Sequence, residues 1–435
     1  MNVSVQIGSE THAVPPPPQS VSETGLTETF LLDLLIKTIF RHGMERPSRM
    51  AEEMRVAGRI VDQLLEKGKE KQLIFMLGQR GANLTSEMRY QLTQKGREWA
   101  LQAMSQNSWT GPAPVPIETF CEQITAQSIR LEPLREERLA QVFKDMILPI
   151  ELMQLIGPAV NSGASMLFYG PPGNGKSTIA RGICTAFQQQ IYVPHALSIG
   201  GDVVVFFDPS VHKPVPTEYN PVGALRRAAV HDPRYVPCHR PFVITGGELT
   251  LEKFDLARNA ATGLYEAPLQ FKAVGGLFVV DDFGRQRETP QQFINRLIVP
   301  LEERVDHLVM DNGRKIEVPF DSLVIFATNY EPRTLVDEAG LRRLRHKIMV
   351  DRPDRMSFVK ILIRTAASAG LTVNEDVLAY ILFDLYGSTA GTRFNAFHPR
   401  FLIDQCVSIC AYQGTPAELT PKVLNQAWDN LVAAH

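Results

Sequence analysis

The residues with the clearest chemical pattern lie between Met166 and Phe187. The sequence MLFYGPPGNGKSTIARGICTAF predicts an apolar strand, a glycine-rich loop and a helix. It fits G-x-x-x-x-G-K-[ST], a pattern in which loop N–H groups and the positive end of the following helix face phosphate oxygens. The alternative, a chance glycine loop, lacks this strand–loop–helix context. We therefore predict a nucleotide triphosphate site formed by Gly170, Pro171, Pro172, Gly173, Asn174, Gly175, Lys176, Ser177 and Thr178.

A pair of acidic residues follows a second apolar strand, in GGLFVVDDFGR at 275–285. Buried carboxylates need a cation, so Asp281 is predicted to hold Mg²⁺ together with Ser177, while Lys176 binds the β and γ phosphates of ATP. Asp282 is the proposed base that activates water, and the alternative is that it only supports the metal shell. An aspartate reaches ~1.5 Å less far than a glutamate, so slow hydrolysis is also consistent with this sequence.

Polar residues further along the chain could complete such a site. Asn329 ends the apolar strand SLVIFATN, where its amide can contact the γ-phosphate and the attacking water; the alternative is a turn-forming asparagine. Arg342 or Arg343 could reach a neighbouring subunit's nucleotide, or both could belong to a solvated helix face. Arg400 lies near the start of a helix with Pro399 in its first turn, where a cation opposes the helix dipole, so a phosphate contact is predicted.

The elements that position these residues belong to an α/β protein. From about residue 131 the pattern alternates helices with apolar strands, which predicts a doubly wound parallel sheet, and after 350 it is helical only. The start of the chain is polar and contains the run Pro15–Pro18. We predict a disordered tail over 1–26, a winged-helix domain over 27–108, a linker and helix over 109–130, an α/β nucleotide-binding domain over 131–350 and an α-helical lid over 351–435.

The winged-helix prediction rests on helical stretches followed by strand-like KQLIFMLG and by MRYQLTQKGREWALQAM, a strand running into a helix capped by Thr93. The segment YQLTQKGREWA resembles the junction between the wing and the last helix of that family. The predicted recognition helix, Gly58 to Lys67, mixes Arg59 and Lys67 with acidic residues. DNA binding and protein docking therefore both stay open for this domain.

Taken in order, the phosphate loop, Asp281, Asn329, the arginine cluster and a helical region with Arg400 resemble the AAA+ ATPases over residues 131–435. The resemblance implies a lidded doubly wound sheet and nucleotide at the subunit interfaces of a ring, usually a hexamer. It also implies that Asn329 is sensor 1 and Arg400 sensor 2. Asp282 departs from the family's usual glutamate. A two-residue hairpin turn is predicted at Asn312–Gly313, shortly before Asn329. A hairpin at this place resembles the clade that includes the MoxR-type and enhancer-binding ATPases.

The segment between Lys176 and Asp281 is longer than a bare nucleotide-binding fold needs, which predicts an insertion. It contains ALSIGGDVVVFFD, a predicted hairpin around Gly200–Gly201. Val204, Phe206 and Phe207, or the loop at 246–247, could contact a client, but the preferred interpretation is that the phenylalanines fill a local core.

The bulk composition narrows the class of protein. The chain has 435 residues, 44% of them hydrophobic, five scattered cysteines and a net charge of −2. We expect reduced thiols, no signal peptide or membrane segment, a cytoplasmic location and no metal beyond Mg²⁺. The function that fits best is a ring-forming ATPase that remodels a protein complex of unknown identity. The alternatives are an ATP-dependent DNA-bound regulator and a nucleotide-gated scaffold with little turnover.

Overall fold

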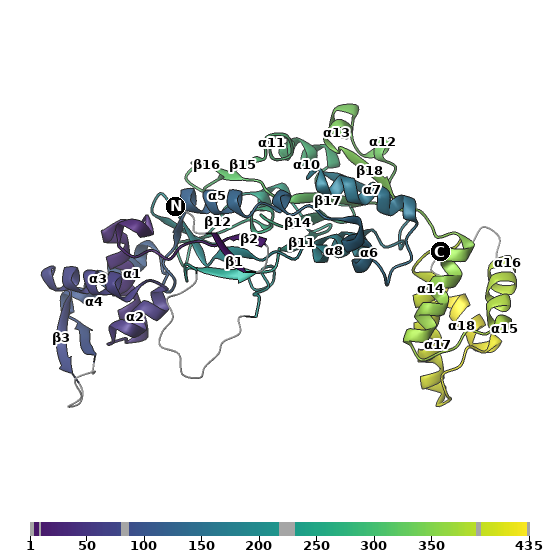
Figure 1. The fold of residues 1–435 in the computed structure, drawn as a ribbon, viewed down its shortest axis with the longest axis horizontal. Helices are drawn as coiled ribbons and strands as arrows, with labels where there is room; N and C mark the ends of the chain where they lie inside the picture. The colour runs from purple at the N-terminus through teal and green to yellow at the C-terminus, as the bar shows by residue number, and fades with distance from the viewer. Residues whose placement is uncertain (1–3, 8–9, 80–86, 217–230, 389–392, 433–435) are drawn as a thin grey trace.

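The computed structural model describes residues 4–7, 10–79, 87–216, 231–388 and 393–432. Three parts follow one another along its long axis: an N-terminal group of helices with a small sheet, a central part built on sheets, and a C-terminal group of helices (Figure 1). Among the described residues, no helix combines the length and apolar character that crossing a membrane requires.

The N-terminal part packs helices around a small antiparallel sheet. Thr27 and Thr93 cap two of its helices by accepting hydrogen bonds from the N–H groups of Phe30 and Gly96. Residues 80–86, between β3 and β4 in the sequence, lie outside the described residues. The elements are α1 (Glu28–His42), α2 (Pro47–Met54), α3 (Gly58–Glu70), β3 (Ile74–Gln79), β4 (Met88–Leu92) and α4 (Gln94–Gln106).

For residues 4–7 and 10–26, part of the segment expected as a disordered tail, the structure describes a strand pair and contacts with distant residues. Strand β1 (Ser4–Ile7) pairs antiparallel with β2 (Glu10–Ala13). Val14 is buried in the core of the central part, and the carbonyl of Pro15 accepts a hydrogen bond from the N–H of Asp232 at 2.8 Å. A proline-rich segment without its own secondary structure is thus fixed by contacts with distant residues, which its local composition does not reveal.

The central part contains a five-stranded sheet in the order β11 (Phe242–Thr245), β14 (Leu277–Val280), β17 (Leu323–Thr328), β6 (Met166–Tyr169), β18 (His346–Met349). All neighbouring pairs are parallel, which confirms the predicted α/β class. Side chains alternate between two cores: Met166 and Phe168 pack on the face covered by α7 (Ile150–Asn161) and α8 (Lys176–Ala186), and Leu167 packs on the other.

Helices cover the second face of this sheet as well. They follow β14 and β17 in the sequence and bury residues such as Phe293 and Leu344 against it. The remaining helices of the central part are α5 (Ile117–Ala126), α6 (Glu136–Val142), α9 (Leu269–Lys272), α10 (Pro290–Arg296), α11 (Ile298–Glu303), α12 (Pro332–Leu335) and α13 (Glu338–Arg343).

The insertion between α8 and β14 supplies four strands of a second sheet, and β5, which precedes α8 in the chain, supplies the fifth. Its order is β12 (Ala257–Asn259), β13 (Leu264–Glu266), β9 (Asp202–Val205), β8 (Ala196–Ile199), β5 (Val115–Pro116), and β7 (Ile191–Pro194) pairs with β10 (Tyr235–Cys238) beside it. Val204 and Phe206 are buried in one core and Phe207 packs against it, as the core interpretation of the hairpin predicts.

The hairpin before Asn329 consists of β15 (Val305–Val309) and β16 (Lys315–Pro319). Its turn differs from the predicted two-residue type. The N–H of Met310 donates to the carbonyl of Arg314, and Gly313 has a φ of 80°, so the loop has three residues with glycine in the left-handed position. The Asn-Gly pair located the turn correctly but not its length.

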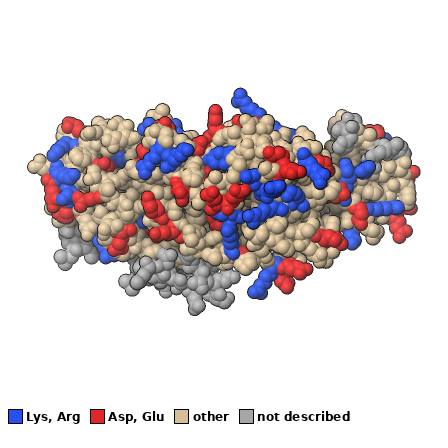
Figure 2. Space-filling view, turned by 90° about the horizontal axis from the view of Figure 1, so that it is seen from above, with Lys and Arg blue, Asp and Glu red and all other residues tan. Residues whose placement is uncertain are grey.

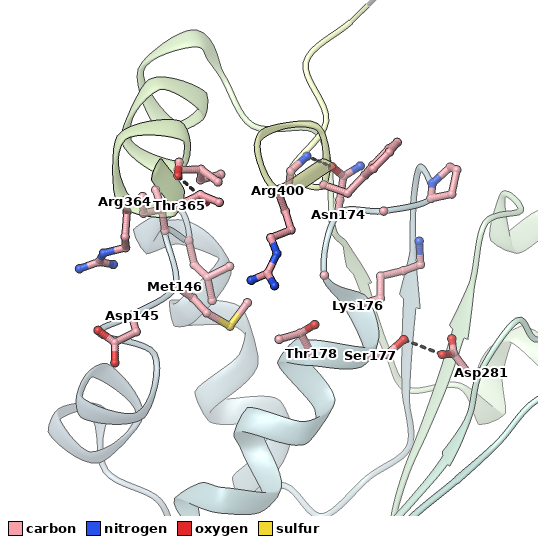
Figure 3. Close-up of a pocket in the computed structure, with 18 of the residues that line it drawn as sticks. Asp145, Met146, Asn174, Lys176, Ser177, Thr178, Asp281, Arg364, Thr365 and Arg400 are labelled. Carbon is pink, nitrogen blue, oxygen red and sulfur yellow. Dashed lines mark hydrogen bonds between the residues drawn. The ribbon is translucent and has the colours of Figure 1, made fainter. Parts of the chain in front are cut away.

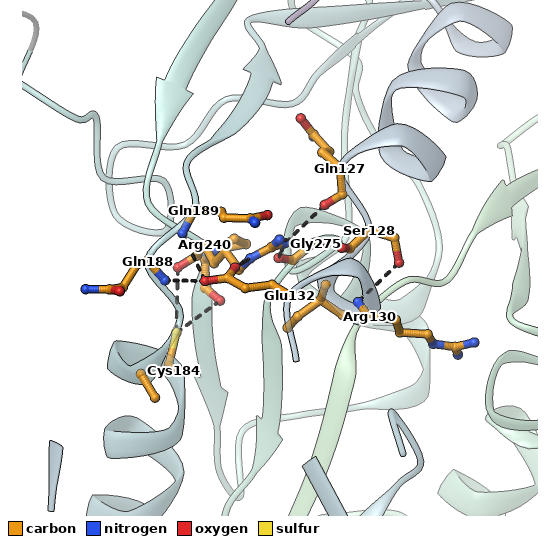
Figure 4. Close-up of polar contacts among 12 residues, drawn as sticks. Gln127, Ser128, Arg130, Glu132, Cys184, Gln188, Gln189, Arg240 and Gly275 are labelled. Carbon is orange, nitrogen blue, oxygen red and sulfur yellow. Dashed lines mark hydrogen bonds and ion pairs between the residues drawn. The ribbon is translucent and has the colours of Figure 1, made fainter. Parts of the chain in front are cut away.

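A buried cation ties the segment before α6 to the main sheet (Figure 4). The Nε of Arg240 donates to the Glu132 carboxylate at 2.8 Å, and its Nη1 donates to the carbonyl of Gly275 at 2.7 Å. Glu132 in turn accepts the N–H groups of Gln188 and Gln189. Both charged groups of this ion pair make further hydrogen bonds to the backbone. The contacts of Glu132 therefore fix the backbone at Gln188 and Gln189, just after α8.

The C-terminal part is helical and packs around its own core. Its elements are α14 (Arg355–Ser368), α15 (Glu375–Ala379), a π-helical turn (Tyr380–Leu385), α16 (Tyr386–Ser388), α17 (His398–Gln413) and α18 (Pro421–Val432).

Candidate functional site

A cavity of ≈ 860 Å³ lies where the carboxyl ends of β6, β14 and β17 face the C-terminal helices (Figure 3). β17 and β18 lie on opposite sides of β6, so the order of strands in the sheet reverses at β6. Open α/β sheets bind their ligands at such a reversal, outside the carboxyl ends of the strands. Of the predicted site residues, those lining the cavity are Pro172, Gly173, Asn174, Gly175, Lys176, Ser177, Thr178, Asp281, Asp282, Asn329 and Arg400.

The glycine-rich loop adopts a backbone that requires glycine. Gly170, Gly173 and Gly175 have φ angles of 131°, 75° and 88°. A side chain at Gly170 would also bring its Cβ within 2.5 Å of the Val350 carbonyl oxygen. The loop therefore turns sharply into α8, and the N-terminal end of that helix faces the cavity.

Lys176 is held at the centre of the loop. Its Nζ donates to the carbonyls of Gly170 and Pro171, both at 2.9 Å, and to Asn329 Oδ1 at 2.8 Å. Burial lowers the pKa of the Lys176 ammonium, while Asp281 and Asp282 oppose that shift. The predicted lysine, the asparagine at the strand end and both acids therefore line the same cavity and lie close together.

Ser177 and Asp281 form the donor set expected for a metal. Ser177 Oγ donates to Asp281 Oδ2 at 2.6 Å. A hydroxyl and a carboxylate beside a phosphate loop fit Mg²⁺, which binds few protein ligands and relies on substrate phosphates and water for the rest. No group of three or more His, Cys, Asp or Glu suited to a metal occurs within the described residues.

Asp282 has an unusual backbone for a residue with a side chain. Its φ is 47°, in the left-handed region that aspartate and asparagine tolerate better than other residues with a Cβ. Asn329 Nδ2 donates to Asp282 Oδ1 at 3.2 Å, so Asn329 connects Lys176 with Asp282. Gln286 Nε2 donates to the carbonyl of Asp281 at 3.1 Å and supports the turn from behind.

The predicted arginines divide into two groups. Arg400 points into the cavity from α17 (Figure 3), and its Nε donates to Asp404 Oδ2 at 2.7 Å. Arg342 and Arg343 belong to α13 and do not line this cavity in the described residues; Arg343 pairs with Glu302 at 3.2 Å. Figure 2 views the protein from the α13 side and shows positive side chains gathered on this face, with acidic ones among them.

The cavity also has a wall that sequence patterns did not reveal. Met146, Ile147 and Leu148 precede α7 and form an apolar surface, which the C-terminal residues Ile361 and Phe397 extend. An apolar wall opposite a phosphate loop suits the flat face of a nucleobase. No motif marks these residues, since they are ordinary apolar side chains that only the packing of distant segments brings together.

Residues 354–430 match a family model described as a domain of unknown function, DUF8689. No curated protein matches the chain. Similar solved structures include a mutant of Thermotoga maritima RuvB, at 12% identity over 68% of this chain and 71% of that one, with a TM-score of 0.36. The complex of magnesium chelatase subunits BchI and BchD is similar at 13% identity over 66% and 92%, with a TM-score of 0.33.

Proposed function

We propose that the protein is an AAA+ ATPase that binds and hydrolyses Mg-ATP in this cavity, assembles into a ring and remodels a protein complex. One observation carries the proposal. Lys176 and Ser177 begin the helix that follows the glycine-rich loop, Asp281 and Asp282 follow β14, and Asn329 follows β17. Hydrogen bonds join these five residues in one chain. That arrangement has the charges and donors that phosphoryl transfer requires.

Each residue has a distinct task in the proposed reaction. Lys176 exchanges its carbonyl partners for the β and γ phosphates, whose negative charge is a stronger acceptor. Ser177 and Asp281 would hold Mg²⁺, which neutralises phosphate charge when bound. Asp282 accepts the proton of the attacking water, and the Asn329 amide, already in contact with Asp282, orients that water. Arg400 adds positive charge from the C-terminal part, which acts as the lid.

The N-terminal part is proposed to dock protein through a winged helix. The lysines of α3 form ion pairs with acidic residues of the same helix. Lys67 Nζ lies 3.0 Å from Glu70 Oε2, and Lys69 Nζ lies 2.6 Å from Glu66 Oε1. Carboxylates beside each lysine weaken the positive potential that a DNA backbone needs. This observation supports a protein partner over the alternative of a DNA-bound regulator.

The ring proposal predicts shared active sites. Alanine at Arg342 or Arg343 is expected to reduce ATP hydrolysis by roughly 10³-fold, since an arginine supplied by a neighbouring chain stabilises charge in phosphoryl transfer. Mixing that variant with inactive Lys176→Ala chains should restore part of the activity, because a hybrid interface combines one intact loop with one intact arginine. Arg258→Ala, an exposed arginine, is the matched control and should behave as the wild type.

The readout is ATPase activity against mixing ratio. A maximum near equal amounts supports the shared site. Mixtures that are no more active than their separate components, with either arginine, would contradict it.

A further inference from the structure

Asn174 of the glycine-rich loop makes hydrogen bonds with residues of the C-terminal part. Asn174 Oδ1 accepts the N–H of Ala396 at 2.9 Å, and Asn174 Nδ2 lies 3.4 Å from Asn395 Oδ1. The same Nδ2 donates to the carbonyl of Pro171 within the loop at 3.3 Å. Asn174 and Asn395 are 5% and 9% exposed, so these amides contact each other with little competition from water. The consequence is a polar bridge between residues that are more than two hundred positions apart in the sequence.

An aromatic contact reinforces this bridge. The Phe397 ring packs against Gly173, where an added Cβ would lie 2.3 Å from Phe397 Cδ1. Gly173 therefore serves two needs at once, its positive φ and the close approach of this ring. The two loop residues in these contacts, Gly173 and Asn174, belong to the phosphate-binding pattern. Neither is charged, since the positive charge of the loop is that of Lys176.

The hydrogen bonds also define the state of a buried histidine. The backbone N–H of Ala396 can only donate, so the oxygen of Asn174 must face it and the NH₂ of Asn174 must face Asn395 Oδ1. The NH₂ of Asn395 then faces His398 Nε2 at 3.2 Å, which makes that nitrogen an acceptor. In the neutral ring the proton consequently resides on Nδ1, which lies 2.6 Å from the hydroxyl oxygen of Tyr386.

We propose that Asn395 and His398 are positioning residues that hold Asn174, and through it the glycine-rich loop, in the conformation that receives the triphosphate. This inference rests on the proposed nucleotide site, and it adds a way in which the C-terminal part regulates nucleotide binding at that site. Tyr386 and His398 lie in the core of the C-terminal part. Movement of that part would therefore shift Asn395 and release the loop without any contact to the nucleotide itself.

The test is a double-mutant cycle on the full-length chain, with Mg-ATP binding measured by titration calorimetry. Each of Asn174→Ala and Asn395→Ala should weaken ATP binding about 5- to 10-fold, the range of one or two net hydrogen bonds. The double variant should bind no more weakly than Asn174→Ala, because both changes remove the same contact. Asn430→Ala removes an exposed amide of α18 from the same part and should bind ATP as the wild type does.

Thermal unfolding of each variant separates positioning from folding. If Asn395→Ala does not fold, Asn395→Ser replaces it, since serine stays polar but is too short to reach Asn174. Unchanged or tighter binding in the Asn395 variant, or losses that multiply in the double variant, would overturn the positioning role alone. A wild-type chain that does not bind ATP would overturn the nucleotide site and this proposal together.

Discussion

Replacing Lys176 with alanine is expected to lower ATP hydrolysis by at least ~100-fold, because it removes the one buried cation among the described residues that line the phosphate loop. The ammonium now makes three hydrogen bonds, so its loss also leaves the Gly170 and Pro171 carbonyls without this donor. The other cations that line the cavity, Arg364 and Arg400, come from the C-terminal part and not from the phosphate loop (Figure 3).

The matched control for this change is Lys422→Ala, which alters an exposed lysine of α18. Both variants should show the wild-type circular dichroism spectrum, and only Lys176→Ala should lose phosphate release in a steady-state assay. Comparable rates in the two variants would exclude Lys176 from catalysis.

Asp282→Asn is expected to lower kcat by ~10²- to 10⁴-fold, the usual contribution of a general base, while ATP binding changes little. Asparagine keeps the size of the side chain and tolerates the left-handed backbone at 282, so the variant removes proton acceptance and preserves the fold. Single-turnover hydrolysis and equilibrium ATP binding, measured side by side, separate the two effects.

Asp282→Glu is the informative companion. It restores a carboxylate, but the longer side chain is less suited to a φ of 47°, so we expect activity below the wild type. This backbone gives a physical reason for an aspartate at position 282. An Asp282→Asn chain with the wild-type rate would instead support the metal-shell role of Asp282 or the low-turnover scaffold.

The sequence predicted those parts of the site that depend on local pattern. Lys176 follows a recognisable loop, and Asp281 and Asn329 each follow an apolar strand, so parallel pairing of those strands was enough to bring them together. The same reasoning predicted the α/β class. The clade resemblance, the winged helix and the ring depend on more than strand order, and they stay predictions.

Contacts between distant segments were beyond the reach of the sequence. Asn395 and Phe397 lie in a stretch without a motif, yet they touch the phosphate loop. The N-terminal residues around Pro15 looked disordered because their partner, Asp232, lies far along the chain. Local composition records propensity, but it does not show which distant N–H group will donate to a given carbonyl.

The most direct test of the account is equilibrium binding of Mg-ATP by the full-length wild-type chain, with Lys176→Ala measured in parallel. The account predicts one ATP per chain, weaker binding when EDTA removes Mg²⁺, and a loss of at least ~10-fold in affinity for Lys176→Ala, as expected for a buried charge-assisted contact. A wild-type chain that takes up no ATP, or a variant that binds it equally well, would contradict the assignment of this cavity as a nucleotide site.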